Sequence, residues 1–413
     1  MRRNRGITLI ALIITIIIML ILVAVSVNVL IKSNLIGTAE NTVDKYKTAS
    51  EEEAKGGTIE INGKKYASIE DYIESTKPLP EGAGKRADKT KEYSDGTKTA
   101  WIPAGFTVSG IRSETTIEGG LVIYDIPEGT TPDWTNPDSV KTAYNQFVWI
   151  PVEVTSSDTE TSIEAFKRSA WTANAETGGE RTTGLSTSYT EPNETNDTAD
   201  KTGIANQIEN LTKSIYKYGG FYIGRYEAGV KPNADGTSTP RTSSSDSQTA
   251  DCVIQQDKYP YTYIKWGKSM SNISEGAVFV SNNLYNTEAY GANSMLCTGA
   301  CWDSMLDFIK DSNHSVKDST TWGNYKNSET FEINRGAYAV YNTSNNTLGS
   351  FNNVGSKYSK TKDTSILLTT GATERNCSKN IYDVAGNCWE WTTESYYSSR
   401  RVDRGRPSQQ RWF

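Results

Sequence analysis

The chain has 413 residues, with 43 basic and 49 acidic side chains, a formal net charge of −6 and one histidine. No basic stripe runs through the body of the chain, which argues against nucleic acid as a partner. The single histidine excludes histidine-rich zinc sites and leaves only His314, in a polar stretch typical of a solvated loop, for a serine or cysteine triad. A chain of this length allows one or two domains beyond any membrane segment.

The N-terminal segment carries the strongest signal. A basic leader, residues 1–6, contains three arginines, and a nearly unbroken apolar run follows from Ile7 to Ile31. As a helix rising about 1.5 Å per residue, this run would be roughly 37 Å long, enough to cross a hydrocarbon core of about 30 Å. Arginines before the run hold the N-terminus in the cytoplasm. We therefore expect a single-pass protein of the cell membrane, with a cytoplasmic N-terminus and most of the chain extracellular.

The residues around the start of the apolar run, Arg5-Gly6-Ile7-Thr8-Leu9-Ile10, resemble the leader junction of type IV prepilins and pseudopilins. The resemblance implies a cut between Gly6 and Ile7 by a prepilin peptidase, methylation of the new N-terminus, and pilus subunits as partners. The family usually has a glutamate five residues into the mature chain, and here that position is Ala11. Its absence argues against filament assembly. A plain signal anchor is the alternative.

The segments after the apolar run predict a stalk, a small module and a linker. Leu35, Ala39, Val43 and Tyr46 follow a helical spacing. Residues 58–66 predict a hairpin with an Asn-Gly turn, and residues 68–73 predict a short capped helix. The expected domains are a leader at 1–6, a transmembrane and stalk helix at 7–55, a hairpin-helix module at 56–76, a linker at 77–98 and one domain at 99–413.

Beyond the linker the chain is polar and aromatic, with short β-like runs that begin at Ala100, Gly120, Gln146 and Gly220. The clearest helix signal is residues 301–309, whose apolar side chains share one face. Residues 155–200 and 233–251 have the composition of exposed insertions. The five cysteines allow at most two internal disulfides, with no connectivity implied. Mixed short strands with few helices predict an α+β class.

Three of these segments, in chain order, resemble the formylglycine-generating enzyme (sulfatase-modifying factor) family, a branch of the C-type lectin fold. The most specific is residues 380–391, NIYDVAGNCWEW, close to the family's Y-D-x-x-G-N-V-W-E-W; the others are residues 147–151, FVWIP, and 220–227, GFYIGRYE. The predicted fold is therefore α+β, with a long N-terminal transmembrane and stalk helix followed by a C-type lectin-like (formylglycine-generating enzyme-like) domain with polar insertions.

The 380–391 segment also predicts a metal site. Asp383 and Glu390 bracket a turn containing Gly386, and two carboxylates with main-chain carbonyls are ligands that a hard cation such as calcium prefers. In the resembling family this segment binds a structural calcium. The resemblance implies as ligands the side chains of Asp383 and Glu390 and the carbonyls of Gly386 and Cys388. The alternative is that the carboxylates only bond local amides, while the two tryptophans of the segment belong to the core.

The resemblance bears on function in two ways. The resembling oxidases hold copper(I) on two cysteines after an R-G-G strand. The counterpart here is Arg404-Gly405-Arg406, and no cysteine follows Cys388, so we do not expect an enzyme. Related domains display ligands, including the variable proteins of diversity-generating retroelements.

We therefore expect a surface ligand-binding or display protein whose ligand is a surface protein or a glycan. The contact residues suggested by the sequence are Arg404, Arg406 and Trp412. The alternative is that residues 400–413 are a truncated C-terminus and not a contact surface. The competing functions are a structural minor pilin or pseudopilin and an oxidase of the formylglycine-generating type.

Overall fold

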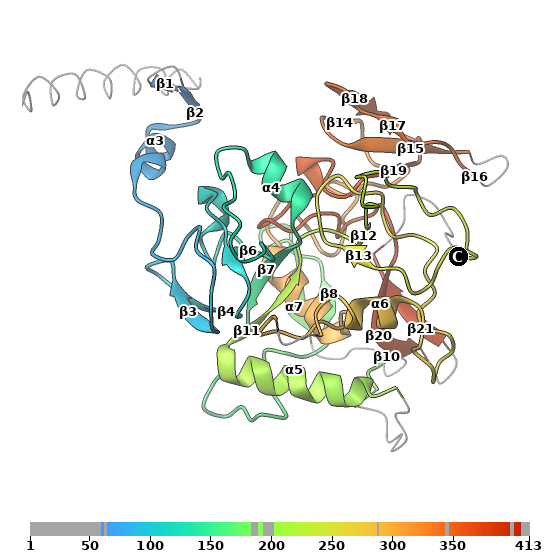
Figure 1. The fold of residues 1–413 in the computed structure, drawn as a ribbon, viewed down its shortest axis with the longest axis horizontal. Coiled ribbons are helices and arrows are strands. Elements are labelled where there is room, and N and C mark those ends of the chain that lie inside the picture. The colour runs from blue at the N-terminus through green and yellow to red at the C-terminus, as the bar shows by residue number, and fades with distance from the viewer. Residues whose placement is uncertain are drawn as a thin grey trace, which may run out of the picture. The chain divides into compact units, whose positions relative to one another are not determined.

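The computed structural model describes residues 59–61, 64–182, 189–192, 202–286, 289–342, 347–396 and 400–405. The chain divides into two compact units, Met1–Pro78 and Leu79–Phe413. The predicted leader cut at Gly6 and Ile7, the transmembrane and stalk helix, and the suggested contacts Arg406 and Trp412 lie outside the described residues. Figure 1 shows the strands of the second unit as several small sheets.

The described part of the first unit is a hairpin followed by a helix. Strands β1 (Ile59–Ile61) and β2 (Lys64–Tyr66) pair antiparallel across the Asn-Gly pair of the sequence, and helix α3 spans Ile69–Thr76. The Ser68 hydroxyl accepts a hydrogen bond of 3.1 Å from the backbone N–H of Asp71, which is an N-terminal cap. Both elements are where the sequence predicts them.

A four-stranded antiparallel sheet lies at the centre of the second unit. Its order is β11 (Gly220–Gly224), β7 (Gln146–Pro151), β6 (Val122–Tyr124) and β5 (Thr107–Val108). Strand β7 forms because its side chains alternate between two buried faces. Val148 and Ile150 pack in one hydrophobic cluster with Met305 of helix α7 (Gly299–Ile309), and Trp149 packs in another with Ile102.

Smaller elements surround this sheet. Strands β3 (Lys91–Ser94) and β4 (Thr99–Ile102) form a hairpin, β8 (Ala170–Thr172) pairs with β9 (Glu180–Thr182), and β12 (Gly229–Val230) pairs with β13 (Cys252–Val253). Strands β10 (Tyr189–Thr190), β20 (Glu390–Tyr396) and β21 (Arg400–Arg404) form a three-stranded sheet in that order.

The predicted 77–98 linker starts near the division between the units, but Ala87 and Tyr93 in its second half are buried in the second unit.

Residues 331–368 form two further small sheets, which lie together in the orange and red region of Figure 1. Strand β14 (Phe331–Ile333) pairs with β18 (Tyr358–Lys360), and β15 (Ala337–Asn342) pairs with β16 (Thr347–Leu348), β17 (Asn352–Asn353) and β19 (Ile366–Leu368). Short helices α4 (Pro137–Ala143), α5 (Ile204–Tyr218) and α6 (Ala277–Asn282) complete the unit, with α5 ending at Gly219 in the left-handed conformation (φ 73°).

The predicted α+β class is wrong for the part of the chain that the structure describes. Small antiparallel sheets dominate it, and its longest helix, α5, has 15 residues. Within these residues no helix is both long enough and apolar enough to span a bilayer. The physical reason is that sustained helical periodicity is confined to α5 and α7, whereas the many short β-like runs each pair locally with a neighbour.

Candidate functional site

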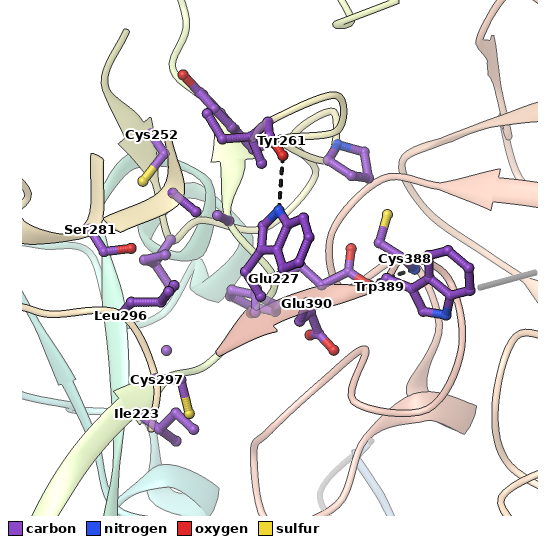
Figure 2. Close-up of a pocket in the computed structure, with 18 of the residues that line it drawn as sticks. Ile223, Glu227, Cys252, Tyr261, Ser281, Leu296, Cys297, Cys388, Trp389 and Glu390 are labelled. Carbon is purple, nitrogen blue, oxygen red and sulfur yellow. Dashed lines mark hydrogen bonds between the residues drawn. The ribbon is translucent and has the colours of Figure 1, made fainter. Parts of the chain in front are cut away.

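A cavity of about 250 Å³ opens in the second unit beside strand β11, helix α7 and the loop 381–391. Figure 2 shows Glu227, Glu390, Cys388 and Trp389 on one side of it and Cys252, Ser281, Leu296 and Cys297 on the other. Aromatic rings form much of the lining: Tyr226, Tyr261, Tyr263, Trp302, Tyr382, Trp389 and Trp391.

The end of β11 positions one wall of the cavity. Arg225, which is 1% exposed, follows the strand and pairs with the buried carboxylate of Glu114 at 2.8 Å. Its backbone N–H donates to the Gln146 carbonyl, and its own carbonyl accepts from the N–H of Tyr382 at 2.9 Å. Because Arg225 is fixed on both sides, the next residues, Tyr226 and Glu227, are held at the cavity wall.

The loop 383–390 is a turn that few residue types can form. Asp383 and Asn387 adopt φ of 64° and 62°, and Gly386 adopts 85°, conformations that favour Asp, Asn and Gly. A Cβ on Gly386 would lie 2.3 Å from the Asn324 carbonyl oxygen, so a larger residue would not fit there. The Asn387 amide fixes the loop further, donating to Glu227 at 3.0 Å and accepting from the N–H of Leu368 at 2.9 Å.

Two buried carboxyl groups, Asp383 and Glu227, lie around this loop together with the half-buried Glu390, whose Oε2 is enclosed. Burial raises the pKa of Asp383 to about 7 and raises the pKa of Glu227 and of Glu390 well above the usual range. Glu227 is satisfied, because its oxygens accept from Asn387 and from the N–H of Cys388. Glu390 Oε2 is buried with no hydrogen-bond partner. Few buried acceptors in proteins lack a protein partner, so this oxygen is available to bind a water molecule or a cation.

The space beside Glu390 is surrounded by oxygen atoms and kept open by a glycine. A Cβ built on Gly405 would lie 2.9 Å from Glu390 Oε2, 3.3 Å from the Cys388 carbonyl oxygen and 3.7 Å from the Val384 carbonyl oxygen. One carboxylate and two carbonyls around one point are ligands of the kind that calcium prefers. The residues present therefore supply three oxygen ligands of the kind that the predicted metal takes, out of a calcium shell of about six to eight.

The structure does not bring all of the predicted metal ligands to one point. Cys388 and Glu390 contribute to the oxygen cluster beside Gly405, whereas Asp383 directs Oδ2 to the N–H of Gly371 at 2.7 Å. The Val384 carbonyl is an addition that the sequence could not indicate, because every residue has a carbonyl. Within the described residues no three His, Cys, Asp or Glu side chains form a metal-binding group, so a cation here would depend on the Glu390 carboxylate and on backbone carbonyls.

The thiols and the histidine are not arranged as nucleophiles. All five cysteines are free, and burial raises the pKa of Cys252 to about 12 and raises the pKa of Cys297 and of Cys388 well above the usual range. These thiols are protonated at neutral pH, and the thiolate is the reactive form. His314 lies outside the cavity lining and contacts Asp311 through Nδ1 at 3.0 Å.

Comparison with protein-family models, with curated proteins and with solved structures gives no match. The likeness to formylglycine-generating enzymes therefore stands on residues 147–151, 220–227 and 380–391 alone.

Arg404, a contact residue suggested by the sequence, is held inside the second unit. Its guanidinium donates to both oxygens of Glu394, at 2.8 and 2.7 Å, and lies 3.6 Å from Asp303.

The sequence predicted neither the cavity itself nor the part played by Glu227. The signal that could have found Glu227 is its place at the end of an apolar run, directly after a tyrosine.

Proposed function

We propose that this chain is a membrane-anchored protein of the cell surface whose second unit binds a ligand and does not catalyse a reaction. The observation that carries the proposal is the aromatic-lined cavity of about 250 Å³ with carboxyl groups at its wall. Its volume lies just below the usual range for drug-sized ligands, so it suits one sugar ring or one side chain of a larger surface protein. A glycan or a surface protein is therefore the proposed ligand.

The chemistry of the cavity favours binding over catalysis. Its three thiols, those of Cys252, Cys297 and Cys388, are protonated at neutral pH because burial raises each pKa. Aromatic faces can stack on the apolar face of a sugar ring or on an aromatic side chain, while acidic groups orient polar atoms of the ligand.

The proposal includes calcium as a structural ion of the 383–390 loop. Glu390, the Cys388 carbonyl and the Val384 carbonyl would hold it in the space beside Gly405. A bound calcium ion would place a positive charge beside Glu390 and so favour the ionised form of its carboxyl group. Because Glu390 also lines the cavity, calcium would keep one wall of the ligand site in place.

A melting experiment tests the calcium part. The full-length chain in detergent should melt at a higher temperature in calcium than in chelator, since an ion a hundredfold above its dissociation constant stabilises by about 2.7 kcal/mol. Asp383→Ala with Glu390→Ala should melt lower and lose the calcium dependence. Glu128→Ala with Glu160→Ala, two exposed carboxylates, is the matched control. Identical melting curves of the wild-type protein with and without chelator would refute this part.

An array of glycans and surface proteins tests the binding part. Ser281 lines the cavity, so Ser281→Phe should fill it and abolish binding to any array ligand that the wild type retains. Val340→Phe, at a side chain 40% exposed on β15, adds the same kind of bulk elsewhere and should leave binding unchanged. If the wild-type protein retains no ligand, or if Ser281→Phe retains the same ones, the cavity is not the binding site.

A further inference from the structure

The chain contains eight Asn-x-Ser/Thr tripeptides in which x is not proline. Their asparagines are Asn193, Asn196, Asn210, Asn272, Asn313, Asn342, Asn345 and Asn376. In exported proteins such a tripeptide is the acceptor of an N-linked glycan, which is attached to the asparagine amide. To accept a glycan in the folded chain, the amide must be exposed, and its tripeptide must be free to enter the active site of a transferase.

Two of the described asparagines fail these conditions through burial or through helix geometry. Asn376 is completely buried, so the folded chain has no room for a glycan there. Asn210 lies within helix α5, and the Thr212 hydroxyl of its tripeptide donates to the Ile208 carbonyl at 2.9 Å. To present this tripeptide in an extended form, the helix would have to unwind.

The tripeptide at Asn313 is held in a packed loop. The His314 ring contacts Asp311 through Nδ1 at 3.0 Å and packs edge-on against the Trp322 ring. The Trp322 indole also donates to the Ser315 carbonyl at 3.0 Å. Both residues that follow the asparagine are therefore fixed, which keeps this tripeptide on the surface of the unit.

Asn272 meets both conditions. It is exposed and closes a turn in which the N–H of Ser269 donates to the Asn272 carbonyl at 3.1 Å. Its side-chain oxygen accepts from the N–H of Ser274 at 2.9 Å, an Asx turn that brings the asparagine amide close to the serine of the tripeptide. Among the described residues, none forms a hydrogen bond with the Asn272 amide nitrogen or with the Ser274 hydroxyl.

The loop around Asn272 is fixed at its sides and open at its tip. The Arg401 guanidinium donates to the Met270 carbonyl at 2.7 Å, and the N–H of Gly276 donates to the Gln248 carbonyl at 2.7 Å. The exposed residues of the tip are Lys268, Ser269, Ser271, Asn272 and Ser274. An exposed loop tip of this kind can carry a bulky group without displacing a packed side chain.

We propose that Asn272 is a site of N-linked glycosylation. Its amide nitrogen forms a bond to the anomeric carbon of a lipid-linked sugar phosphate. The bond from that carbon to the phosphate oxygen breaks, the lipid phosphate leaves, and the amide proton passes to a base of the transferase. The inference rests on the proposed surface location, because the predicted anchor places the chain in the membrane that holds the lipid-linked donor.

Mass spectrometry of the full-length chain, purified from membranes of its natural host, tests this site. Cleavage after Lys268 and after Glu275 releases the peptide 269–275, which should be heavier than its sequence by at least one sugar residue. Asn272→Gln and Ser274→Ala should each abolish the added mass. Ser274→Thr should keep it, because threonine also completes the tripeptide.

Asn233→Gln is the matched control. Asn233 is exposed but is followed by Ala and Asp, so its replacement should leave the mass of the 269–275 peptide unchanged. A bare 269–275 peptide in the wild type, or an added mass that survives Ser274→Ala, would overturn the inference.

Protease treatment of intact cells separates this inference from the proposed surface location. A bare Asn272 on a chain that the protease removes overturns the glycosylation site alone. A bare Asn272 on a chain that the protease cannot reach overturns both the site and the surface location.

Discussion

Glu191 is a buried carboxyl group outside the 383–390 loop through which pH should change the stability of the second unit. It follows β10 and is 3% exposed. Its two oxygens accept from the N–H of Gly299 at the start of α7 and from the Thr393 hydroxyl on β20, both at 2.6 Å. Burial raises its pKa to about 7, the Thr393 bond lowers it in part, and the neighbouring carboxylate of Glu394 raises it further.

The magnitude follows from the difference between the folded and unfolded pKa. The pKa of Glu191 is about 7 in the folded chain against a reference of 4.5, and each unit is worth about 1.4 kcal/mol. The folded state keeps the proton to a higher pH than the unfolded state does. The stability that Glu191 contributes is therefore fully present below pH 4.5 and is lost as pH rises through about 7, by roughly 3 kcal/mol in all.

Glu191→Gln should remove this loss, because an amide does not ionise. We expect the free energy of urea unfolding of the variant, relative to wild type, to rise by roughly 3 kcal/mol between pH 4 and pH 8. Glu128→Gln, at an exposed position, is the control and should follow the wild type at each pH. A difference between Glu191→Gln and wild type that stays constant with pH, or falls as pH rises, would refute the reasoning.

Three further predictions concern the anchor and the absence of catalysis. Protease treatment of intact cells should remove the chain after Lys55. If the chain after Lys55 stays intact while a cytosolic marker is also protected, the predicted orientation in the membrane is wrong. Mass spectrometry of the mature N-terminus should find a cut between Gly6 and Ile7, and an intact Met1 or a cut after Ile31 would exclude prepilin-like processing. Copper-loaded protein offered a sulfatase-type peptide should give no formylglycine, and detectable turnover would overturn the non-catalytic assignment.

Local signals in the sequence predicted local structure well. Strands β1 and β2 pair as the hairpin signal at 58–66 predicts, and the apolar face at 301–309 lies in α7. The helix starts two residues earlier than that face because Thr298 caps it, accepting from the N–H of Cys301 at 3.0 Å. Each of these features is decided by residues within a few positions of one another.

The features that the sequence could not predict depend on partners far apart in the chain. Glu227 meets Asn387 across 160 positions, and Gln256 meets Gly371 across 115. The composition of 77–98 predicted a linker, yet Tyr93 is buried because its hydroxyl reaches the Thr115 carbonyl at 2.7 Å. The fold class failed for the same reason, since the pairing partner of each short strand is fixed by packing and not by local pattern.

The central claim, a ligand cavity whose wall depends on calcium, is tested most directly by one fluorescence titration. Trp302, Trp389 and Trp391 line the cavity, so a ligand selected from the array should change the tryptophan emission of the full-length chain as it binds. The account predicts a saturable change in calcium, a weaker affinity in chelator and no change in Ser281→Phe. A titration that is identical in Ser281→Phe, or that yields no saturable change with any ligand, would contradict it.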